Sequence, residues 1–337
     1  MSRPLAYSLT LIMFCMVGVR LFAQTPQWLS VADSILGSHY NDSIIYSRID
    51  SNYVCRPQGR WTFKTRLNIS GATFDAIGTD SHSGYRQHMH MPTDIKSTLS
   101  ASVTYMGISA GISINPKLLV GKYKDYELNL NSYGNKLGID VILHKSKSDG
   151  GWVKALDPID NKELYIQDIS NSKTATLNTN IYWALNSRRF SMPAAFNMTY
   201  IQKKSTGSVL LGLSYQGQET EANTENTRWN YHAHNIGVGV GYGYNMVVRR
   251  DWLIHLSSIP TFMVYTDSKA SIEGQDMKLK NKFPRVILTG RGSVIRYDGN
   301  KFYGLSMVYT YTSIGKHSQL HISSDKWRIR LIYGWRL

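Results

Sequence analysis

The sequence predicts an all-β fold, a transmembrane antiparallel β-barrel of about 12 strands with an inward or periplasmic plug segment. Three observations support this fold class. The last eleven residues alternate between apolar and cationic side chains up to the final leucine. Similar alternation recurs between turn residues from residue 61 onward. After residue 23, no run of about 18 apolar residues remains that could form a transmembrane helix.

The segment 327–337 is the clearest strand. One of its faces carries Trp327, Ile329, Leu331, Tyr333, Trp335 and Leu337. The other carries Arg328, Arg330, Gly334 and Arg336, with Ile332 as the one apolar exception. Side chains alternate across a strand, so one face suits lipid and the other suits an aqueous interior. We expect this strand to close the barrel and to engage the barrel-assembly machinery.

The N-terminal residues 1–23 are predicted to be a secretory signal peptide, with Arg3 before an apolar stretch and a cleavage site after Ala23. Residues 24–60 then form a periplasmic N-terminal segment, in which 28–36 have the spacing of a short amphipathic helix or belong to a frayed tail. This organisation predicts the outer membrane of a Gram-negative cell, after signal-peptide cleavage, as the location.

Cleavage would remove Arg3 and Arg20, lowering the formal net charge from +15 to +13, and would leave Cys55 as a single cysteine. A single cysteine forms no intramolecular disulfide, so stability is expected to come from hydrogen-bonded closure of the sheet. The positive charge predicts anionic partners, namely outer-membrane lipid and lipopolysaccharide or a small acidic solute. Nucleic acid is not expected as a partner of an exported chain.

Residues 61–337 are assigned to the barrel. Its strands are predicted near 61–69, 99–105, 108–114, 126–131, 137–143, 175–183, 209–215, 236–246, 252–256, 286–294, 303–311 and 327–337. Tight turns near 106, 133, 186, 249 and 299 should share the periplasmic rim. Longer linkers near 71–94, 115–124, 146–172, 217–229, 267–283 and 314–324 should share the other rim. The polar stretch 145–172 contains Asp-Gly-Gly and Asp-Pro and is expected to be a long loop.

Residues 188–204 do not fit as a barrel strand. An extra strand here would exchange the two rims for every later turn and would break the even strand number of such barrels. We therefore expect this segment to lie under or inside the barrel as a plug or re-entrant segment.

The same region resembles a signature of an uncharacterised family of Bacteroidota outer-membrane barrels, domain of unknown function 4421. Its residues are Asn186, Arg189, Phe190, Ser191, Ala194, Ala195, Phe196, Gln202, Lys203, Lys204, Ser205, Gly207, Ser208 and Gly212. The blocks 132–140 and 241–244 are similar to further shared motifs. The resemblance implies the barrel fold and its location, and implies no reaction or cargo.

Charged side chains on the predicted inner face are mostly cationic. They are Lys64, Arg66, Arg291, Arg328, Arg330 and Arg336, set against Glu127 and Asp140. Inward Arg and Lys favour anions, which predicts a passive pore or a binding barrel for small anionic solutes. A salt-bridged interior that simply fills a narrow barrel explains the same residues. No cofactor is expected.

Four glycines, Gly237, Gly239, Gly241 and Gly243, alternate along one strand face. They open no helix, so a phosphate-binding loop is excluded by context. Glycine in a strand permits close backbone approach, and we expect this stripe to receive the segment 188–204.

Two His-x-His pairs, His88/His90 and His232/His234, point the same way on an extended chain and form a candidate metal site. Polar loop residues would look the same. For catalysis the sequence contains no Gly-x-Ser-x-Gly and no His-Glu-x-x-His motif. Ser205, Ser208, His144 and His255 are the candidate parts of an outer-membrane lipid-modifying enzyme, lipase- or deacylase-like, which is the second candidate class. A structural or surface-interaction barrel is the third.

Overall fold

The computed structural model describes residues 49–57, 59–79, 86–92, 95–105, 108–115, 126–148, 151–157, 162–169, 171–223, 228–272, 275–278, 286–314 and 320–337. The predicted signal peptide 1–23 and the predicted helix 28–36 lie outside these ranges. The unit described below is Ile49–Arg336. Among its described residues, no helix is long and apolar enough to cross a membrane.

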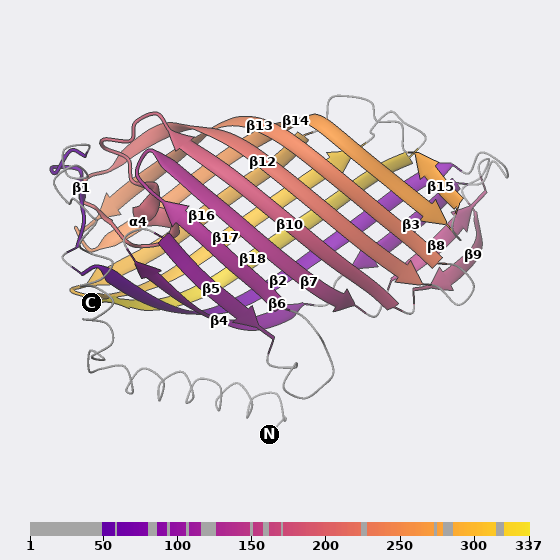
Figure 1. Cartoon of the computed structure of the whole chain (residues 1–337), viewed down its shortest axis with the longest axis horizontal. Coiled ribbons are helices and arrows are strands. Elements are labelled where there is room, and N and C mark those ends of the chain that lie inside the picture. The colour runs from indigo at the N-terminus through magenta and orange to yellow at the C-terminus, as the bar shows by residue number, and fades with distance from the viewer. Residues whose placement is uncertain are drawn as a thin grey trace, which may run out of the picture. The chain divides into compact units, whose positions relative to one another are not determined.

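Twelve of the described strands form one closed antiparallel sheet (Figure 1). They are β2 (Trp61–Thr79), β4 (Lys96–Tyr105), β5 (Ile108–Ile114), β6 (Tyr126–Tyr133), β7 (Leu137–Ser148), β10 (Asn171–Ala184), β12 (Thr206–Asn223), β13 (Arg228–Val248), β14 (Trp252–Ile272), β16 (Val286–Asp298), β17 (Lys301–Ile314) and β18 (Leu320–Arg336). Pairing of β18 with β2 closes the ring, with Arg336 opposite Thr62 and Leu320 opposite Gly78. The prediction of a barrel of about 12 strands is confirmed.

The outward positions of these strands carry an apolar belt. Leu331 is 55% exposed, whereas Ile332 and Arg336, which point inward from the same strand, are 7% and 1% exposed. The same pattern exposes Ile112, Leu128, Leu143, Trp183, Val240, Leu256, Leu288 and Leu305. Large apolar side chains on a closed sheet that no other described element covers are what acyl chains would cover. The barrel is therefore a transmembrane barrel.

Aromatic rings gather on the outward face where the strands meet the end that carries the short turns. Trp61 lies 4.5 Å from Tyr105, and Phe63 lies 5.4 Å from Trp335, between ring centroids. Tyr303 and Tyr333 continue the row at 5.4 Å. Such a girdle marks a membrane–water interface. The turns 134–136, 249–251 and 299–300 lie at this end, as the sequence predicts.

The opposite end differs from the prediction, because several strands continue well past the apolar belt. The stretch 145–172 is not a long loop. Strand β7 continues to Ser148, and β8 (Trp152–Leu156) and β9 (Glu163–Asp168) form a hairpin that pairs with β3 (Arg86–Pro92). Strand β15 (Gln275–Lys278) pairs antiparallel with the last residues of β14 in the same region. Outside the bilayer neither face must be apolar, so the alternation disappears while backbone hydrogen bonding continues.

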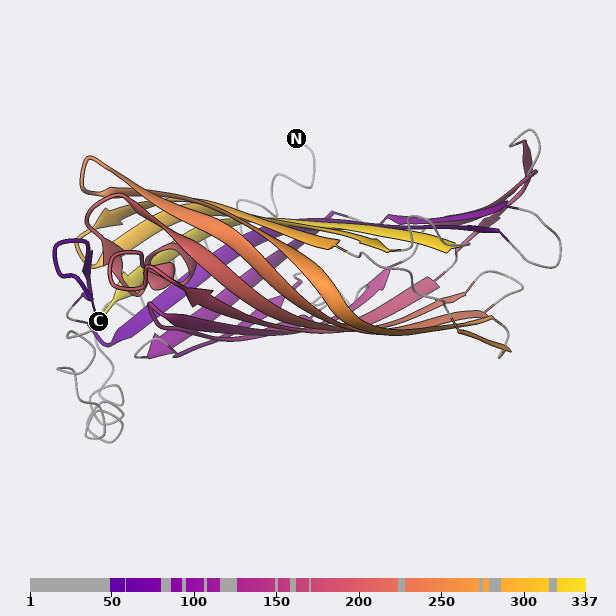
Figure 2. The same cartoon turned by 90° about the horizontal axis from the view of Figure 1, so that it is seen from above.

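Residues 188–204 contribute no strand to the barrel, as predicted. They contain the short helix α4 (Met192–Phe196) and β11 (Ile201–Gln202), and β11 pairs with β1 (Val54–Cys55) in a separate two-stranded sheet. Figure 2 shows α4 between the barrel walls, at the end where β1 lies. Phe190, Met192 and Ala194 are fully buried. Their burial against inward side chains of the barrel makes this end the main apolar core of the described unit.

Candidate functional site

Inward side chains line a cavity of about 290 Å³ in the barrel lumen. Seven of its lining residues are Lys or Arg and two are carboxylates: Lys64, Arg66, Lys96, Arg291, Lys326, Arg328 and Arg330 against Glu127 and Asp140. Strands far apart in the chain supply these groups, because closure of β18 on β2 brings the last strand next to the first. An enclosed lining with an excess of one charge concentrates ions of the opposite charge.

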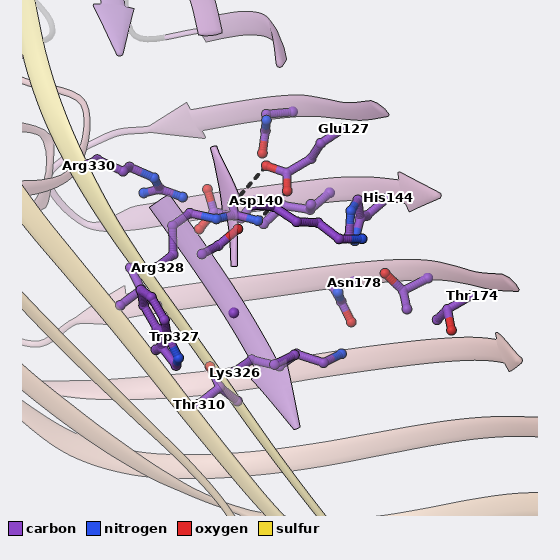
Figure 3. A pocket seen from close by; sticks show the side chains of 18 of the residues that line it. Glu127, Asp140, His144, Thr174, Asn178, Thr310, Lys326, Trp327, Arg328 and Arg330 are labelled. Carbon is purple, nitrogen blue, oxygen red and sulfur yellow. Dashed lines mark hydrogen bonds and ion pairs between the residues drawn. The ribbon is translucent and has the colours of Figure 1, made fainter. Parts of the chain in front are cut away.

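Both carboxylates already have cationic partners. Arg328 donates from Nη1 to Glu127 Oε1 over 2.8 Å and from Nη2 to Oε2 of the same carboxylate. Arg291 Nη2 lies 3.3 Å from Asp140 Oδ2, and Tyr133 donates its hydroxyl to Asp140 Oδ1. Figure 3 shows Glu127 and Arg328 meeting in the lumen. These pairs are the salt-bridged interior that the sequence allows, and they account for only two of the cations.

Four further cations line the cavity without a carboxylate within ion-pair distance among the described residues: Lys64, Arg66, Lys326 and Arg330. Of these, Lys64 donates to a backbone carbonyl, which leaves Arg66, Lys326 and Arg330. Three like charges, Arg328, Arg66 and Arg291, act on Arg330 electrostatically, against one carboxylate, Glu127, which already pairs with Arg328. Clustered cations that lack counter-charges of their own attract an anion from solution.

The floor of the cavity is the segment 188–204, because Phe196 and Asn197 belong to its lining. The guanidinium of Arg291 stands over the Phe196 ring at 4.7 Å and over the Tyr182 ring at 4.9 Å. Lys64 Nζ donates to the Asn197 carbonyl oxygen over 2.9 Å. Two of the lumen cations therefore contact this segment as well as the cavity.

Side chains from several barrel strands hold the backbone of the segment. Arg336 donates twice to the Met198 carbonyl, from Nη2 over 2.6 Å and from Nε over 3.1 Å. Asn245 Nδ2 donates to the Ser191 carbonyl over 3.0 Å, and the Tyr297 hydroxyl donates to the Ala194 carbonyl over 3.1 Å. Together with Lys64, these donors come from β2, β13, β16 and β18. The segment is thus anchored around much of the barrel circumference.

Gln202 connects the segment to residues 49–55. Its buried amide accepts from the backbone N–H of Ser191 and donates to carbonyls of Arg189, Tyr53 and Lys204, over distances between 2.6 and 3.1 Å. Asp50 adds a backbone hydrogen bond to Arg188 and an ion pair with Arg189. The residues before the first barrel strand therefore pack against the segment.

The cationic residues predicted to line the lumen all point inward, and five of the six line the cavity. The exception is Arg336, which is 1% exposed and lies behind the segment 188–204. Sequence reasoning missed Lys326 and Lys96. Lys326 continues the inward series of Arg328 and Arg330 by two residues, so a longer terminal strand would have revealed it.

The signature residues of the segment have distinct positions. Phe190, Ser191, Ala194, Ala195 and Gln202 are buried, whereas Arg189, Lys203, Lys204 and Ser205 are exposed. Asn186 donates to the carbonyl of Gly207, and its backbone N–H donates to Ser208 Oγ. Ser191 caps α4 by accepting from the Ala194 N–H. Most of the signature therefore builds and anchors the segment, and Phe196 alone of these residues lines the cavity.

In the glycine stripe, Gly239 and Gly241 allow the adjacent barrel strand to approach closely. A Cβ at Gly239 would lie 2.8 Å from the carbonyl oxygen of Pro260, and one at Gly241 would lie 2.0 Å from that of Ser258. A Cβ at Gly243 would lie 3.1 Å from Phe190 of the segment. At Gly239 and Gly241 the nearest atoms belong to the adjacent strand β14, a close approach that was not predicted. That the whole stripe receives 188–204 stays a prediction.

The histidine pairs find partners other than a metal. His90 Nδ1 lies 2.6 Å and His88 Nε2 3.3 Å from one oxygen of Asp75. His234 Nδ1 bonds the Tyr215 hydroxyl over 2.9 Å, and His232 lies 3.8 Å from Glu219. No group of three metal-ligating side chains is found among the residues that the structure describes. Metal binding at these pairs stays a prediction.

The catalytic candidates are separate from one another. Ser205 and Ser208 bond backbone groups of Val247 and Val209, while His144 lines the cavity. His255 instead lies between two residues that sequence reasoning missed: Nε2 is 2.9 Å from Ser257 Oγ and Nδ1 is 2.7 Å from Asn245 Oδ1. Asn245 uses its amide nitrogen for two acceptors, so its oxygen accepts from Nδ1–H and Nε2 accepts from Ser257.

Comparison with protein families finds a match over most of the chain. The model described as "Domain of unknown function (DUF4421)" matches residues 48–337. Comparison with curated proteins finds no match.

Several solved structures are similar at low identity. The outer-membrane protease OmpT of Escherichia coli has 8% identity and a TM-score of 0.48, covering 83% of this chain and 97% of that chain. The translocator domain of the autotransporter NalP of Neisseria meningitidis has 10% identity and a TM-score of 0.34, covering 92% and 97%. The toluene transporter TodX of P. putida has 8% identity and a TM-score of 0.31, covering 83% and 91%. Similarity this low assigns no activity.

Proposed function

The chain belongs to the family of domain of unknown function DUF4421, and from that premise we propose that it is an outer-membrane barrel that binds a small anionic solute in its lumen. The observation that carries the proposal is the charge of the cavity lining. Seven cations face two carboxylates, and both carboxylates are already paired. Arg66, Lys326 and Arg330 are left to meet an anion. Hydrogen bonds to charged groups contribute about 1.5–3 kcal/mol each, enough for selective binding.

Binding is favoured over passive permeation by the segment 188–204. Its backbone carbonyls accept from Lys64, Arg336, Asn245 and Tyr297, and two of its residues form the cavity floor. Displacing the segment would leave several of these buried donors without partners, at a cost of about 1–3 kcal/mol each. In this proposal the segment closes the periplasmic end of the resting barrel.

The proposed location is the outer membrane, after signal-peptide cleavage. The apolar belt and the aromatic girdle support a barrel that contacts lipid directly. Lipopolysaccharide then surrounds the outer part of the barrel, and the C-terminal strand β18, which closes on β2, is the segment offered to the barrel-assembly machinery.

The binding test uses the purified full chain in detergent and titrates inorganic phosphate by calorimetry. We expect the double variant Arg66→Gln/Arg330→Gln to bind at least about tenfold more weakly than the unmodified chain, since two charge-assisted contacts are lost. Arg296→Gln is the matched control, because Arg296 is exposed near a periplasmic turn and pairs with Asp251. Absence of phosphate binding, or equal binding by all three proteins, would refute the proposal.

The closure test measures conductance in planar bilayers. The unmodified chain should show little steady conductance. Gln202→Leu should increase anion-selective conductance, because it removes the hydrogen bonds that Gln202 makes within 188–204 and the one that joins this segment to Tyr53. Migration on unheated gels verifies that the variant barrel is folded. A large steady conductance in the unmodified chain would contradict the closed binding barrel and would support a passive anion pore instead.

A lipid-modifying hydrolase is the second candidate, favoured by one observation. Ser257, His255 and Asn245 form a hydrogen-bonded chain in which an unprotonated Nε2 faces a hydroxyl, the arrangement of a nucleophile with its base. Against this, the three residues are 4%, 2% and 0% exposed, behind α4. Labelling by a fluorophosphonate that disappears in Ser257→Ala would support the hydrolase. Absence of labelling in folded protein would indicate that Ser257, His255 and Asn245 only help to anchor the segment 188–204.

A further inference from the structure

The lumen cavity has two chemically different walls. Lys326, Arg328 and Arg330 project from β18, and Arg66 projects from the adjacent β2. Thr174, Thr176 and Asn178 project from β10. In the barrel ring, β10 and β18 are separated by five strands on either side, so the two walls face each other across the lumen. Figure 3 shows Thr174 and Asn178 on one side and Lys326, Arg328 and Arg330 on the other.

The wall formed by β10 and its neighbour β12 carries neutral groups that both donate and accept hydrogen bonds. Thr174 and Thr220 hydroxyls lie 3.2 Å apart, and Gln218 Nε2 donates to Thr220 over 3.1 Å. Each hydroxyl keeps capacity for a further bond. The Asn178 amide also lines the cavity. A row of amides and hydroxyls is suited to the hydroxyl groups of a ligand.

The presence of a cationic wall and a neutral polar wall favours an anion that also carries hydroxyl groups. An inorganic anion would be satisfied by the cations of β18 and β2 and would make no use of the polar wall. A fatty acid that crossed the lumen from Arg66 and Arg330 would place its chain against Thr174, Thr176 and Asn178, leaving their polar groups desolvated at a cost of about 1–3 kcal/mol each. The cavity volume of about 290 Å³ is close to the lower end of small-molecule sites, which is about 300 Å³.

We propose that the ligand is an anionic sugar, a sugar phosphate or a uronic acid, which lies across the lumen. Its charged group contacts Arg66 and Arg330 on one side of the lumen, and its hydroxyls contact Thr174, Thr176 and Asn178 on the other. This inference rests on the proposed function, anion binding in the lumen, and adds the chemical class and the orientation of the ligand.

The experiment compares four ligands on the full-length chain in detergent by calorimetry: glucose 6-phosphate, glucuronate, inorganic phosphate and glucose. We expect glucose 6-phosphate to bind about thirtyfold more tightly than inorganic phosphate, as two additional hydrogen bonds of about 1 kcal/mol each would give. Glucuronate should bind measurably, and glucose alone should bind at least about a hundredfold more weakly than glucose 6-phosphate.

Variants of the polar wall test the orientation. Thr174→Val/Asn178→Leu keeps the side-chain volumes and should abolish the advantage of glucose 6-phosphate over phosphate, while phosphate affinity stays unchanged. Asn180→Leu is the matched control, on the same strand and the same face but lining a separate small cavity. This control variant should still bind glucose 6-phosphate more tightly than inorganic phosphate. Gel migration of the unheated proteins verifies folding of each variant.

The outcomes separate the two proposals. If phosphate and glucose 6-phosphate bind equally, or if the polar-wall variant keeps the advantage, the anionic sugar is wrong and the proposed anion-binding function stands. If none of the anions binds, the proposed function itself fails. If glucose binds as tightly as glucose 6-phosphate, the cationic wall does not hold the ligand and the inference is overturned.

Discussion

Glu127 and Asp140 determine how much of the positive charge of the lumen is available to a ligand. Each carboxylate is held by one arginine, through two nitrogens in the case of Glu127 and Arg328. The sequence places all four side chains on the inner face by strand alternation alone. Which arginine serves which carboxylate depends on the closed ring, because Glu127 on β6 and Arg328 on β18 are 201 positions apart.

Replacing Glu127 by Gln should change stability and binding in opposite directions. The variant leaves Arg328 without its counter-charge, and breaking a largely buried ion pair costs about 3–5 kcal/mol. The same change adds one uncompensated cation to the cavity, so phosphate should bind more tightly. Urea unfolding and phosphate calorimetry measure the two effects. Unchanged or weaker phosphate binding in a folded Glu127→Gln barrel would contradict a contribution of Arg328 to anion binding in the cavity.

Cys55 lies in β1, outside the barrel wall, and provides a second prediction about a single residue. Burial raises the pKa of its thiol, and the nearby charges of Lys203 and Arg336 oppose this rise only in part. With the pKa raised, the folded protein holds less thiolate at neutral pH than a free cysteine does. In a chain carrying Cys15→Ser, iodoacetamide should react more slowly with folded than with unfolded protein, and the difference should shrink at alkaline pH. Equal rates in both states at neutral pH would contradict it.

At the scale of elements, each long strand has a part within the apolar belt, where side chains alternate between apolar and polar, and a part beyond it, where this alternation is lost. Within the apolar belt, alternation identifies each strand and its faces. Beyond the belt, β2, β7, β12, β13 and β14 continue through polar sequence, and the β8–β9 hairpin is added. Periodicity carries no signal there, because both faces of an emerging strand meet water. Backbone pairing, which any polar sequence can make, sets the length of these extensions.

The contact between β13 and β14 gives a prediction for elements. Gly239→Leu should destabilise the folded barrel, because a Cβ there would meet the Pro260 carbonyl at 2.8 Å and the Thr261 hydroxyl at 2.6 Å. The expected loss is about 1–3 kcal/mol, the usual cost of overpacking, and is seen as a lower gel-shift temperature.

Gly290→Ala is the matched control. Its Cβ would meet nothing within 4 Å, and the variant should be as stable as the unmodified chain or slightly more so. If Gly239→Leu keeps full heat resistance, the two strands are farther apart than their glycines indicate.

At the scale of the whole described unit, the barrel sheet must meet three requirements at once. Lipid requires apolar outward side chains, closure requires β18 to pair with β2, and the interior requires that buried polar groups find partners. The segment 188–204 meets the last requirement at one end, since its carbonyls receive Lys64, Arg336, Asn245 and Tyr297. The cationic cavity occupies the interior above it.

The apolar belt predicts how an added charge acts at different depths. Leu331→Arg places a cation on the outward face within the belt and should cost about 2–4 kcal/mol, whereas Val248→Arg, beside the turn 249–251, should cost about 0–1 kcal/mol. Both residues are exposed on the outward face. Folding into lipid vesicles, followed by gel shift in urea, measures both. Equal costs would show that the bilayer does not cover Leu331.

The sequence by itself determined the fold class, the strand faces, the even strand number and the exclusion of 188–204 from the ring, because these follow from local alternation and from parity along one chain. It also placed Arg66 and Arg330 on the inner face. Only the tertiary structure decided which cations keep no carboxylate partner, that Arg336 lies behind 188–204, and that Ser257 and Asn245 flank His255. These relations join strands far apart in sequence, and the register at which the sheet closes, which no local pattern contains, determines which inward side chains meet.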